Sequence, residues 1–254
     1  MNTYKIYPLK LGEFQEHEKS TLLYLRGAGI KMINPIIAYL IQGNGLNILV
    51  DTGCGDPEWS ARYHHPIVQT EDMLIENALK AHGVEPKDIT CIVNTHLHWD
   101  HCWNNYKFPG KKIYVQKREM EFAMHPIPMQ WAYYESEEVG LTPPFKKTMD
   151  QYELVDGDMN LYDGIDLVFI PSHTPGFQGV LVNTEKGKYL IASDCLGQFE
   201  NWEGDSVLKH IPSAIHVDLT ECYATYDKIE RICDYILPGH DAKVFNESVY
   251  PPER

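Results

Sequence analysis

Basic residues are scarce in this chain. Its 254 residues include 22 Lys and Arg against 36 Asp and Glu, which gives a formal net charge of −14. No stripe of Lys and Arg offsets this excess, and such a surface repels a phosphate backbone, so we expect no nucleic acid partner. Bound metal dications would cancel part of the negative charge, and a carboxylate-rich site would itself raise the acidic count.

Long apolar runs are also missing. None approaches the roughly 20 residues that span a bilayer, so we do not expect a membrane protein. The N-terminal sequence MNTYK lacks a basic region followed by an apolar stretch, so we expect no secretory signal and a cytoplasmic location. The hydrophobic fraction of 43% suffices for a sizeable core. Because no linker, repeat or low-complexity tract divides the chain, we predict a single domain over residues 1–254.

The six cysteines form no CxxC pair and are too sparse for a disulfide scaffold. We interpret them as reduced thiols. Cys102 and Cys195 each directly follow a polar residue able to bind metal, His101 and Asp194. Neighbouring side chains in an extended segment point to opposite faces, so we interpret both cysteines as packing residues, with metal ligation as the alternative.

Short apolar runs separated by turn residues predict many strands and few helices. Apolar residues near helical spacing predict helices at 71–82, 118–124 and 219–232. Prolines and aromatic residues crowd positions 125–147, where we expect an elaborated loop or a loose helix. In each half of the chain the strands come first and a helix follows, which predicts two sheets packed face to face with helices outside. The predicted strands are 4–9, 36–41, 46–50, 91–93 and 112–115 in the first half, and 152–155, 165–170, 179–182, 189–192 and 235–237 in the second.

The densest concentration of metal-binding groups is the run HLHWDH at 96–101. It follows the predicted buried strand 91–93, so its three imidazoles and one carboxylate lie where a rigid strand gives way to a loop. Histidine and aspartate at this density predict metal-assisted chemistry on a small molecule. A purely structural origin would require three histidines to gather at one strand end by accident.

Four further polar residues share this setting at the end of a short apolar strand beside Gly or Pro. They are Asp51, His173, Asp194 and His240. Because each follows a strand, all of them can meet the histidine cluster at one rim of the sheets. Such a set supplies nitrogen and oxygen ligands for two adjacent metal ions, for which Zn²⁺ is the usual choice.

The order and spacing of these residues resemble the metallo-β-lactamase superfamily, whose signature has the form HxHxDH. The match runs from about Pro35 to Lys243. The resemblance implies an α/β (α+β) fold, a four-layer αββα sandwich of two mixed β-sheets flanked by helices.

The resemblance also implies two Zn²⁺ ions per chain, with Fe, Mn or Co able to replace zinc. Asp51 matches a superfamily residue that supports the ligands without touching the metals. The implied ligands are His96, His98 and His173 for the first ion, Asp100, His101 and His240 for the second, and Asp194 as the bridge between them.

Two metal ions roughly 3.5 to 4 Å apart can hold a bridging hydroxide at neutral pH and polarise a carbonyl. Asp194 would set their separation. Asp100 would deliver a proton to the leaving alkoxide, a role that the resemblance implies for lactonases of this superfamily.

Within the superfamily the chain is most similar to the N-acyl homoserine lactonases, with the pyridoxolactone-cleaving enzymes as close relatives. The similarity rests on the length and on the segments 35–40, 49–53 and 237–241. Both groups open a small cyclic ester. The resemblance therefore implies a lactonase that acts on a small molecule, with quorum quenching as its setting, and leaves a homodimer open.

One departure from the lactonases concerns the substrate carbonyl. Lactonases carry a tyrosine a few residues past the bridging aspartate, which contacts that carbonyl, whereas Asp194 is followed here by CLGQF. Either Tyr223 or Tyr226 approaches from elsewhere, or the enzyme handles its carbonyl differently.

Other residues suggest the pocket walls. Trp103 either shapes the pocket or packs in the core, and the segments 22–33 and 131–134 are candidates for apolar walls. The pair His64-His65 has no spacing that demands a metal, and we do not assign it to the site.

Two other activities of the same fold are alternatives: a thioester hydrolase of the glyoxalase II type and an iron-dependent sulfur dioxygenase. Enzymes that act on glutathione thioesters need basic residues to bind the glutathione carboxylates, and the sequence has no matching cluster of Lys and Arg. A β-lactamase is disfavoured by the bridging position of Asp194, and an RNA-processing enzyme by the charge and by the missing additional domain. A non-hydrolytic protein that kept its metal ligands is the alternative outside enzymes.

Overall fold

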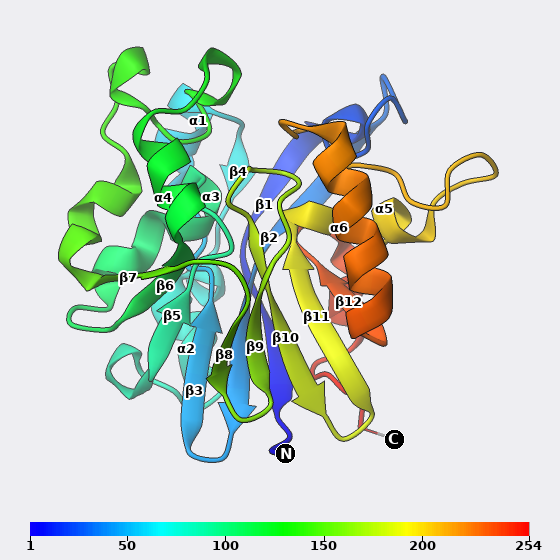
Figure 1. Cartoon of the computed structure of the whole chain (residues 1–254). Helices are drawn as coiled ribbons and strands as arrows, with labels where there is room; N and C mark the ends of the chain where they lie inside the picture. Colours follow the sequence, from blue (N-terminus) through cyan, green and yellow to red (C-terminus); the bar gives the residue numbers. More distant parts are fainter. Residues whose placement is uncertain (254) are drawn as a thin grey trace.

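The computed structural model describes residues 1–253, and its strands form two sheets (Figure 1). The first sheet contains β1 (Lys5–Glu18), β2 (Lys31–Gly43), β3 (Leu46–Val50), β4 (Ile67–Val68), β5 (Cys91–Val93), β6 (Ile113–Gln116) and β7 (Tyr152–Val155). The second contains β8 (Met159–Tyr162), β9 (Ile165–Phe169), β10 (Gln178–Thr184), β11 (Gly187–Ser193) and β12 (Tyr235–Pro238). The helices are α1 (Pro57–Tyr63), α2 (Ile75–Lys80), α3 (Trp99–Cys102), α4 (Lys117–Met124), α5 (Phe199–Glu203) and α6 (Leu219–Ile232).

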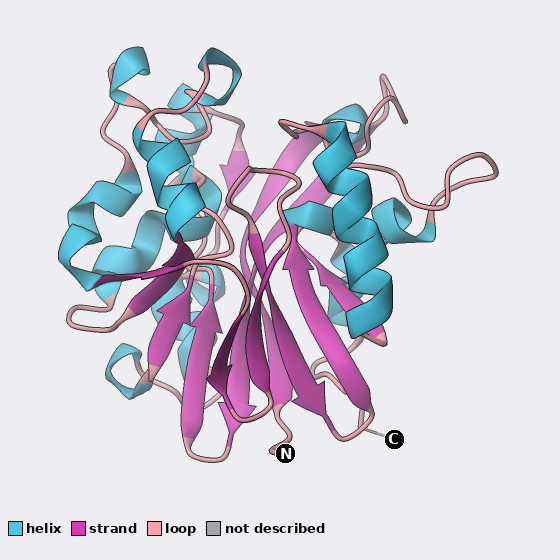
Figure 2. Cartoon of the chain, viewed as in Figure 1, coloured by secondary structure: helices cyan, strands magenta, loops and turns pink. Residues whose placement is uncertain are grey.

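The two sheets pack face to face, and helices lie outside them (Figure 2). The strand orders are β4-β1-β2-β3-β5-β6-β7 and β12-β11-β10-β9-β8. Val93 of the first sheet and Ile191 of the second belong to one buried core between the sheets. Leu79 of α2 packs on the outer face of the first sheet, and Ile229 of α6 packs on the outer face of the second. Both sheets contain parallel and antiparallel pairs. The predicted four-layer αββα sandwich of two mixed sheets is confirmed.

A tight turn sets the register of β2 against β3. Asn44 and Gly45 both have positive φ, 52° and 78°, and the pairing closes with Gly43 opposite Leu46. Two-residue hairpins with positive φ at both central positions favour the sequence Asn-Gly. This local signal aligns β3, at whose end Asp51 follows.

In the first sheet the chain enters the site from the ends of parallel strands. β3 and β5 are parallel, with Val50 opposite Val93, so the residues that follow them meet at one edge. Asp51 accepts a hydrogen bond from the Thr95 amide over 2.8 Å as a result. The short helix α3 starts at this edge, at the end of the molecule away from the chain termini (Figure 1).

The second sheet contributes to the same rim in the same way. β11 and β12 are parallel, with Ser193 opposite Pro238, so Asp194 and His240 leave the sheet side by side. The loop with His173 connects β9 to the antiparallel β10.

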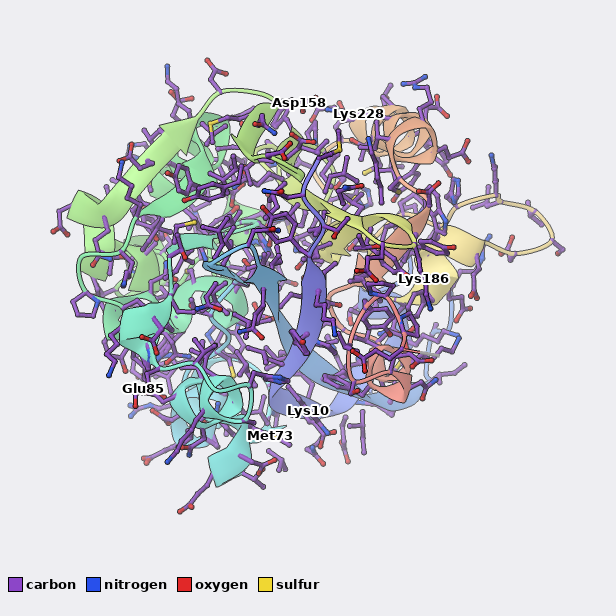
Figure 3. The ribbon with its side chains drawn as sticks, turned by 90° about the horizontal axis from the view of Figure 1, so that it is seen from below. Lys10, Met73, Glu85, Asp158, Lys186 and Lys228 are labelled. Carbon is purple, nitrogen blue, oxygen red and sulfur yellow. The ribbon has the colours of Figure 1, made fainter. Side chains whose placement is uncertain are left out.

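Figure 3 views the molecule from below, from the side on which the termini lie. There Lys228 of α6 lies beside Asp158, and its Nζ donates to Asp158 Oδ1 over 2.7 Å and to the Phe169 carbonyl over 2.8 Å. These contacts attach α6 to the second sheet. In the described part of the chain, every helix is too short or too polar to cross a membrane.

Several element predictions need correction. The predicted helix 71–82 is a 3₁₀ turn at Glu71–Met73 followed by α2, because Leu74 between them has extended backbone angles, φ −65° and ψ 132°. The strand 152–155 pairs with β6 and belongs to the first sheet, not with the other strands of the second half. The segment 125–147 lacks a regular helix, as predicted, and contains short 3₁₀ turns.

Candidate metal centre

The seven predicted ligands and Asp51 all lie at this rim. Among the described residues, three overlapping groups have ligand atoms within 4.8 Å of one another. We call the first group His96, His98 and His173, and the second group Asp100, His101 and His240; the third group, His96, His101 and Asp194, overlaps both.

In the first group each imidazole has a hydrogen-bonding partner that is not a predicted ligand; for His96 it is the Thr95 hydroxyl, 3.0 Å from Nδ1. The Nε2 of His98 donates to Gln130 Oε1 over 2.9 Å, and the Nδ1 of His173 donates to the Ile215 carbonyl over 2.9 Å. The other nitrogens, His98 Nδ1 and His173 Nε2, face each other at 3.1 Å. Because the outward nitrogens carry the protons, two lone pairs point at one position, as metal coordination requires.

In the second group the outward nitrogens are also bonded. The Nδ1 of His101 donates to Asp51 Oδ2 over 2.9 Å, and the Nδ1 of His240 donates to the Pro35 carbonyl over 2.8 Å. Asp100 Oδ2 lies 3.6 Å from His101 Nε2 and 3.8 Å from His240 Nε2. Two imidazoles and a carboxylate therefore converge on a second position.

Asp194 lies between the two groups. Its Oδ2 is 3.5 Å from His173 Nε2 and 3.4 Å from His101 Nε2, and its Oδ1 is 3.2 Å from His240 Nε2. One carboxylate thus reaches histidines of both groups. A β-carbon at position 239 would collide with Asp194 Oδ1, so glycine is the residue that leaves room for this carboxylate.

The unsatisfied atoms of the site fit bound cations. His96 Nε2, His101 Nε2 and Asp194 Oδ1 are buried without a hydrogen-bond partner. Leaving buried polar atoms unpartnered is unfavourable, and native structures usually give each of them a partner. Imidazole and carboxylate donors suit zinc or a similar borderline ion.

Charge separates the two groups in the metal-free protein. Burial lowers the pKa of His173 to about 4 and lowers the pKa of His96 well below its usual value. Burial also disfavours the charged form of His101, but nearby carboxylates, Asp194 above all, outweigh it and raise the pKa of His101. The pKa of His240 is raised in the same way.

Asp51, predicted to support the ligands without touching the metals, lies behind His101. Its Oδ1 accepts from the Thr95 amide over 2.8 Å, and its Oδ2 accepts from the Thr95 hydroxyl over 2.8 Å and from His101 Nδ1 over 2.9 Å. Asp51 has φ 62°, a conformation that aspartate and asparagine tolerate better than most residues.

A buried carboxylate beside the site was not predicted. Glu119 is fully buried and accepts from the Leu97 amide, the Tyr134 hydroxyl and the Thr174 hydroxyl at 3.0, 2.7 and 2.6 Å. It thereby links the loop of the histidine cluster to the loop of His173. The available sequence signal was a charged residue on the apolar side of the predicted helix 118–124.

A cavity of about 290 Å³ lies over the ligands. Asp100 and Asp194 are part of its lining, and no Lys or Arg of the described residues belongs to it. The residues that form its walls around the ligands are Phe14, His17, Thr21, Leu22, Tyr63, His64, His65, Trp99, Met129, Ala132, Tyr133, Gly197, Ser213 and Ile215.

The predicted walls are correct in part. From 22–33 only Leu22 lines the cavity, and from 131–134 only Ala132 and Tyr133 do so. Trp103 packs beside a core cluster and is not part of the lining. His64 and His65, which have no spacing that demands a metal, belong to none of the metal-binding groups among the described residues. Both nevertheless line the cavity, which the sequence did not indicate.

Neither tyrosine considered for the substrate carbonyl reaches the cavity. Tyr223 is exposed on α6, and Tyr226 is buried in the core outside the second sheet. The tyrosines of the lining are Tyr63 and Tyr133. Cys102 and Cys195 are buried in separate core clusters and belong to none of the metal-binding groups, in line with the packing interpretation.

Residues 34–240 match the family model of the metallo-beta-lactamase superfamily. The chain belongs to this superfamily. Its similar relatives include an N-acyl homoserine lactonase of Bacillus sp, 34% identical over 183 residues, which cover 67% of this chain and 68% of that protein. The N-acyl homoserine lactonase AttM of Rhizobium radiobacter is 27% identical over 243 residues, 90% of each chain.

Solved structures agree with this placement. An N-acyl homoserine lactone hydrolase with the product N-hexanoyl-L-homoserine at its catalytic metal center has a TM-score of 0.76 and 25% identity, with 97% of this chain and 96% of that chain covered. AidC, a dizinc quorum-quenching lactonase, shares the fold, with a TM-score of 0.69, 18% identity and coverage of 99% and 95%. The predicted superfamily and the predicted class of enzyme, a hydrolase of ester bonds, are confirmed.

Proposed function

We propose that this member of the superfamily is a dinuclear zinc lactonase that opens a small cyclic ester, an N-acyl homoserine lactone or a related lactone. The observation that carries the proposal is the pair of ligand groups joined by Asp194 on the floor of one cavity. The lactonases among its relatives support the choice of substrate class.

In this proposal the first group would hold one zinc ion, the second group would hold the other, and Asp194 would be available to both. Two zinc ions so placed would supply a water that attacks at neutral pH and would polarise the lactone carbonyl. The partners described above, such as Gln130 and Asp51, keep each imidazole lone pair directed inward. Iron, manganese or cobalt would suit the same donors.

Asp100 is the residue that we assign to proton transfer. It lines the cavity, and its side chain is 12% exposed, so a bound substrate can reach its carboxylate. A carboxylate beside the reacting centre can accept the proton that the attacking water releases and return it to the leaving alkoxide. Ring opening needs this proton because an alkoxide is a poor leaving group in water.

The cavity suits an apolar substituent. Phe14, Leu22, Trp99, Met129 and Ile215 provide apolar surface around the polar floor, which fits an acyl or aromatic group. The lack of Lys and Arg in the described lining disfavours the glutathione thioesters of the alternative hydrolase.

The test is hydrolysis by purified protein loaded with two equivalents of zinc. We expect ring opening of γ-lactones, followed as acid release in a panel that varies acyl length and ring, and loss of activity on chelation. Absence of hydrolysis across the panel with two zinc ions bound would refute the lactonase. Metal analysis separates the sulfur dioxygenase, which would contain predominantly iron at one ion per chain.

A further inference from the structure

Tyr133 lies directly beside the metal-binding loop although it comes from a distant part of the sequence. Its carbonyl accepts a hydrogen bond from the Trp99 amide over 2.9 Å. Its ring lies against the His98 ring, with centroids 5.3 Å apart and an interplanar angle of 34°. Tyr133 lines the cavity together with Asp100 and Asp194.

The loop that carries Tyr133 is fixed on both sides. Gln130 accepts from His98 Nε2 over 2.9 Å. Glu135 is buried, and its Oε1 accepts from Trp59 Nε1 over 2.6 Å and from His64 Nε2 over 2.8 Å. Tyr133 is therefore held between two anchored residues, and its position relative to the metal ligands is set before any substrate binds.

Most other side-chain donors of the cavity already have protein partners. His17 uses both ring nitrogens, with Thr21 and Asn34 at 2.9 and 3.1 Å. The Thr21 hydroxyl donates to the Glu18 carbonyl over 2.6 Å. The Ser213 hydroxyl lies 3.3 Å from Nδ1 of His173, a predicted metal ligand.

Within residues 1–253, the Tyr133 hydroxyl forms no hydrogen bond to protein. The Tyr63 hydroxyl is also free, but the Tyr63 ring packs against Trp59, with centroids 4.4 Å apart at an interplanar angle of 47°, and 36% of the residue is exposed. The His65 ring packs against His17 with centroids 5.3 Å apart. Of the cavity-lining donors Tyr63, His65 and Tyr133, Tyr133 is the one whose ring contacts a predicted metal ligand, His98.

We propose that the Tyr133 hydroxyl donates a hydrogen bond to the carbonyl oxygen of the bound ester and is a catalytic residue of this enzyme. The inference rests on the proposed lactonase function. As water adds to the carbonyl carbon, the C=O π electrons move to the oxygen, and the phenol O–H stabilises the resulting negative charge. The phenol keeps its proton throughout, so no bond of Tyr133 forms or breaks.

A donor of this kind acts mainly on the transition state. Removing one preorganised donor to a developing oxyanion commonly lowers kcat by about 10²-fold to 10³-fold. Because bound metal ions would also polarise the oxygen, we expect a loss below that range, about 10-fold to 100-fold. Because the bond strengthens as charge develops, kcat and kcat/KM should fall together with little change in KM.

The test compares Tyr133→Phe with Tyr223→Phe in zinc-loaded protein. The phenylalanine ring preserves the packing on His98 and the backbone bond to Trp99, so the first variant removes only the hydroxyl. Tyr223 lies outside the cavity on α6, and its variant should match the wild type. Both variants should bind two zinc ions per chain, as measured by elemental analysis.

A binding measurement provides a second readout. Calorimetric affinity for a cyclic phosphonate ester, a stable mimic of the tetrahedral oxyanion, should weaken about as much in Tyr133→Phe as kcat/KM does. Wild-type rates with fully loaded Tyr133→Phe would overturn the proposal while leaving the lactonase function intact. A loss of rate in His65→Asn but not in Tyr133→Phe would overturn it as well, because His65 would then be the donor. If the wild type itself opens no lactone, the proposed function fails, and the role of Tyr133 fails with it.

Discussion

The two ligand groups differ in charge although they lie at one rim and Asp194 is close to histidines of both. The first group consists of three imidazoles, and the partners that orient them are uncharged, such as the Gln130 amide and the Ile215 carbonyl. The second group contains the Asp100 carboxylate, and its His101 donates to a second carboxylate, Asp51. The pKa values differ as well: burial lowers them for His96 and His173, whereas nearby carboxylates, Asp194 first and Asp100 next, raise them for His101 and His240.

The comparison indicates that the two groups respond differently to protons and to metal ions. Neutral imidazoles with low pKa values keep their lone pairs free for a metal ion down to mildly acidic pH. The carboxylates in and beside the second group, Asp100 and Asp51, attract a cation more strongly, but they also favour protons on its histidines. We therefore expect metal binding to the first group to depend less on pH and on nearby charge than metal binding to the second group.

The largest effect should come from Asp194→Ala, which removes what the two groups share. We expect loss of at least one zinc ion per chain and a fall in lactone hydrolysis of about 10³-fold or more, because both the second ion and the shared carboxylate are lost. Elemental analysis and steady-state rates measure these effects. A fully loaded and fully active variant would refute the bridging role.

Asp100→Asn changes the charge of the second group alone. The amide cannot transfer a proton as a carboxyl does, so we expect kcat to fall by about 10²-fold to 10⁴-fold while substrate still binds. Zinc in the first group should be retained. Similar kcat values for the variant and the wild type would remove Asp100 from the mechanism.

The outer partners allow a matched pair of variants. Asp51→Asn keeps a residue suited to φ 62° but removes the charge behind His101, whereas Gln130→Leu removes the neutral partner of His98. We expect Asp51→Asn to weaken the second zinc ion and Gln130→Leu to weaken the first, each by about 10-fold to 100-fold. Competition with a chromophoric chelator measures both affinities. Equal weakening of both ions in each variant would show that the two groups act as one.

The pH dependence of the metal-free protein should separate the groups by sign. His173, with a pKa lowered to about 4, stays neutral when folded while the unfolded chain takes up a proton, so stability falls as pH drops from about 6.5 towards 4. His101 and His240, with raised pKa values, stabilise the fold below pH 6.5 and lose that contribution as pH rises through their folded pKa values. Urea unfolding with a chelator, from pH 4 to 9, measures both slopes. A curve that is flat below pH 6.5 would contradict the first.

The smallest effect is expected outside both groups. Lys228→Met removes the ion pair with Asp158, whose side chains are 29% and 58% exposed. Exposed pairs contribute little, so the free energy of unfolding should change by at most about 1 kcal/mol. Zinc content and lactone hydrolysis should stay at wild-type values. A change in metal binding here would show that the site depends on distant packing.

Much of the site follows from local patterns. The run HLHWDH after a buried strand contains four of the candidate ligand residues at the rim. The strand ends before Asp194 and His240 point to two more. The sequence Asn-Gly at 44–45 forms the turn of the β2–β3 hairpin, as this dipeptide commonly does. These signals depend on residues close together in the chain, where backbone preference and burial are encoded directly.

Other features depend on contacts that no local pattern reports. The strand 152–155 looked like its neighbours in sequence, yet its partner is β6 of the other sheet. Glu119 is hard to recognise from the sequence because the residue type does not show whether a glutamate is buried or exposed. Tyr223 and Tyr226 are candidates on sequence alone because chain order does not reveal that both lie outside the cavity.

The sequence by itself therefore determined the family, the sandwich of two sheets and the candidate ligands, because each depends on residue type and on spacing along strands. Only the tertiary structure decided which nitrogen of each histidine faces inward, which residues wall the cavity, and that Tyr133 lies beside His98. Those features depend on how the two sheets and the loop of Tyr133 pack together. Packing joins residues far apart in the chain, and the chain order alone does not specify such contacts.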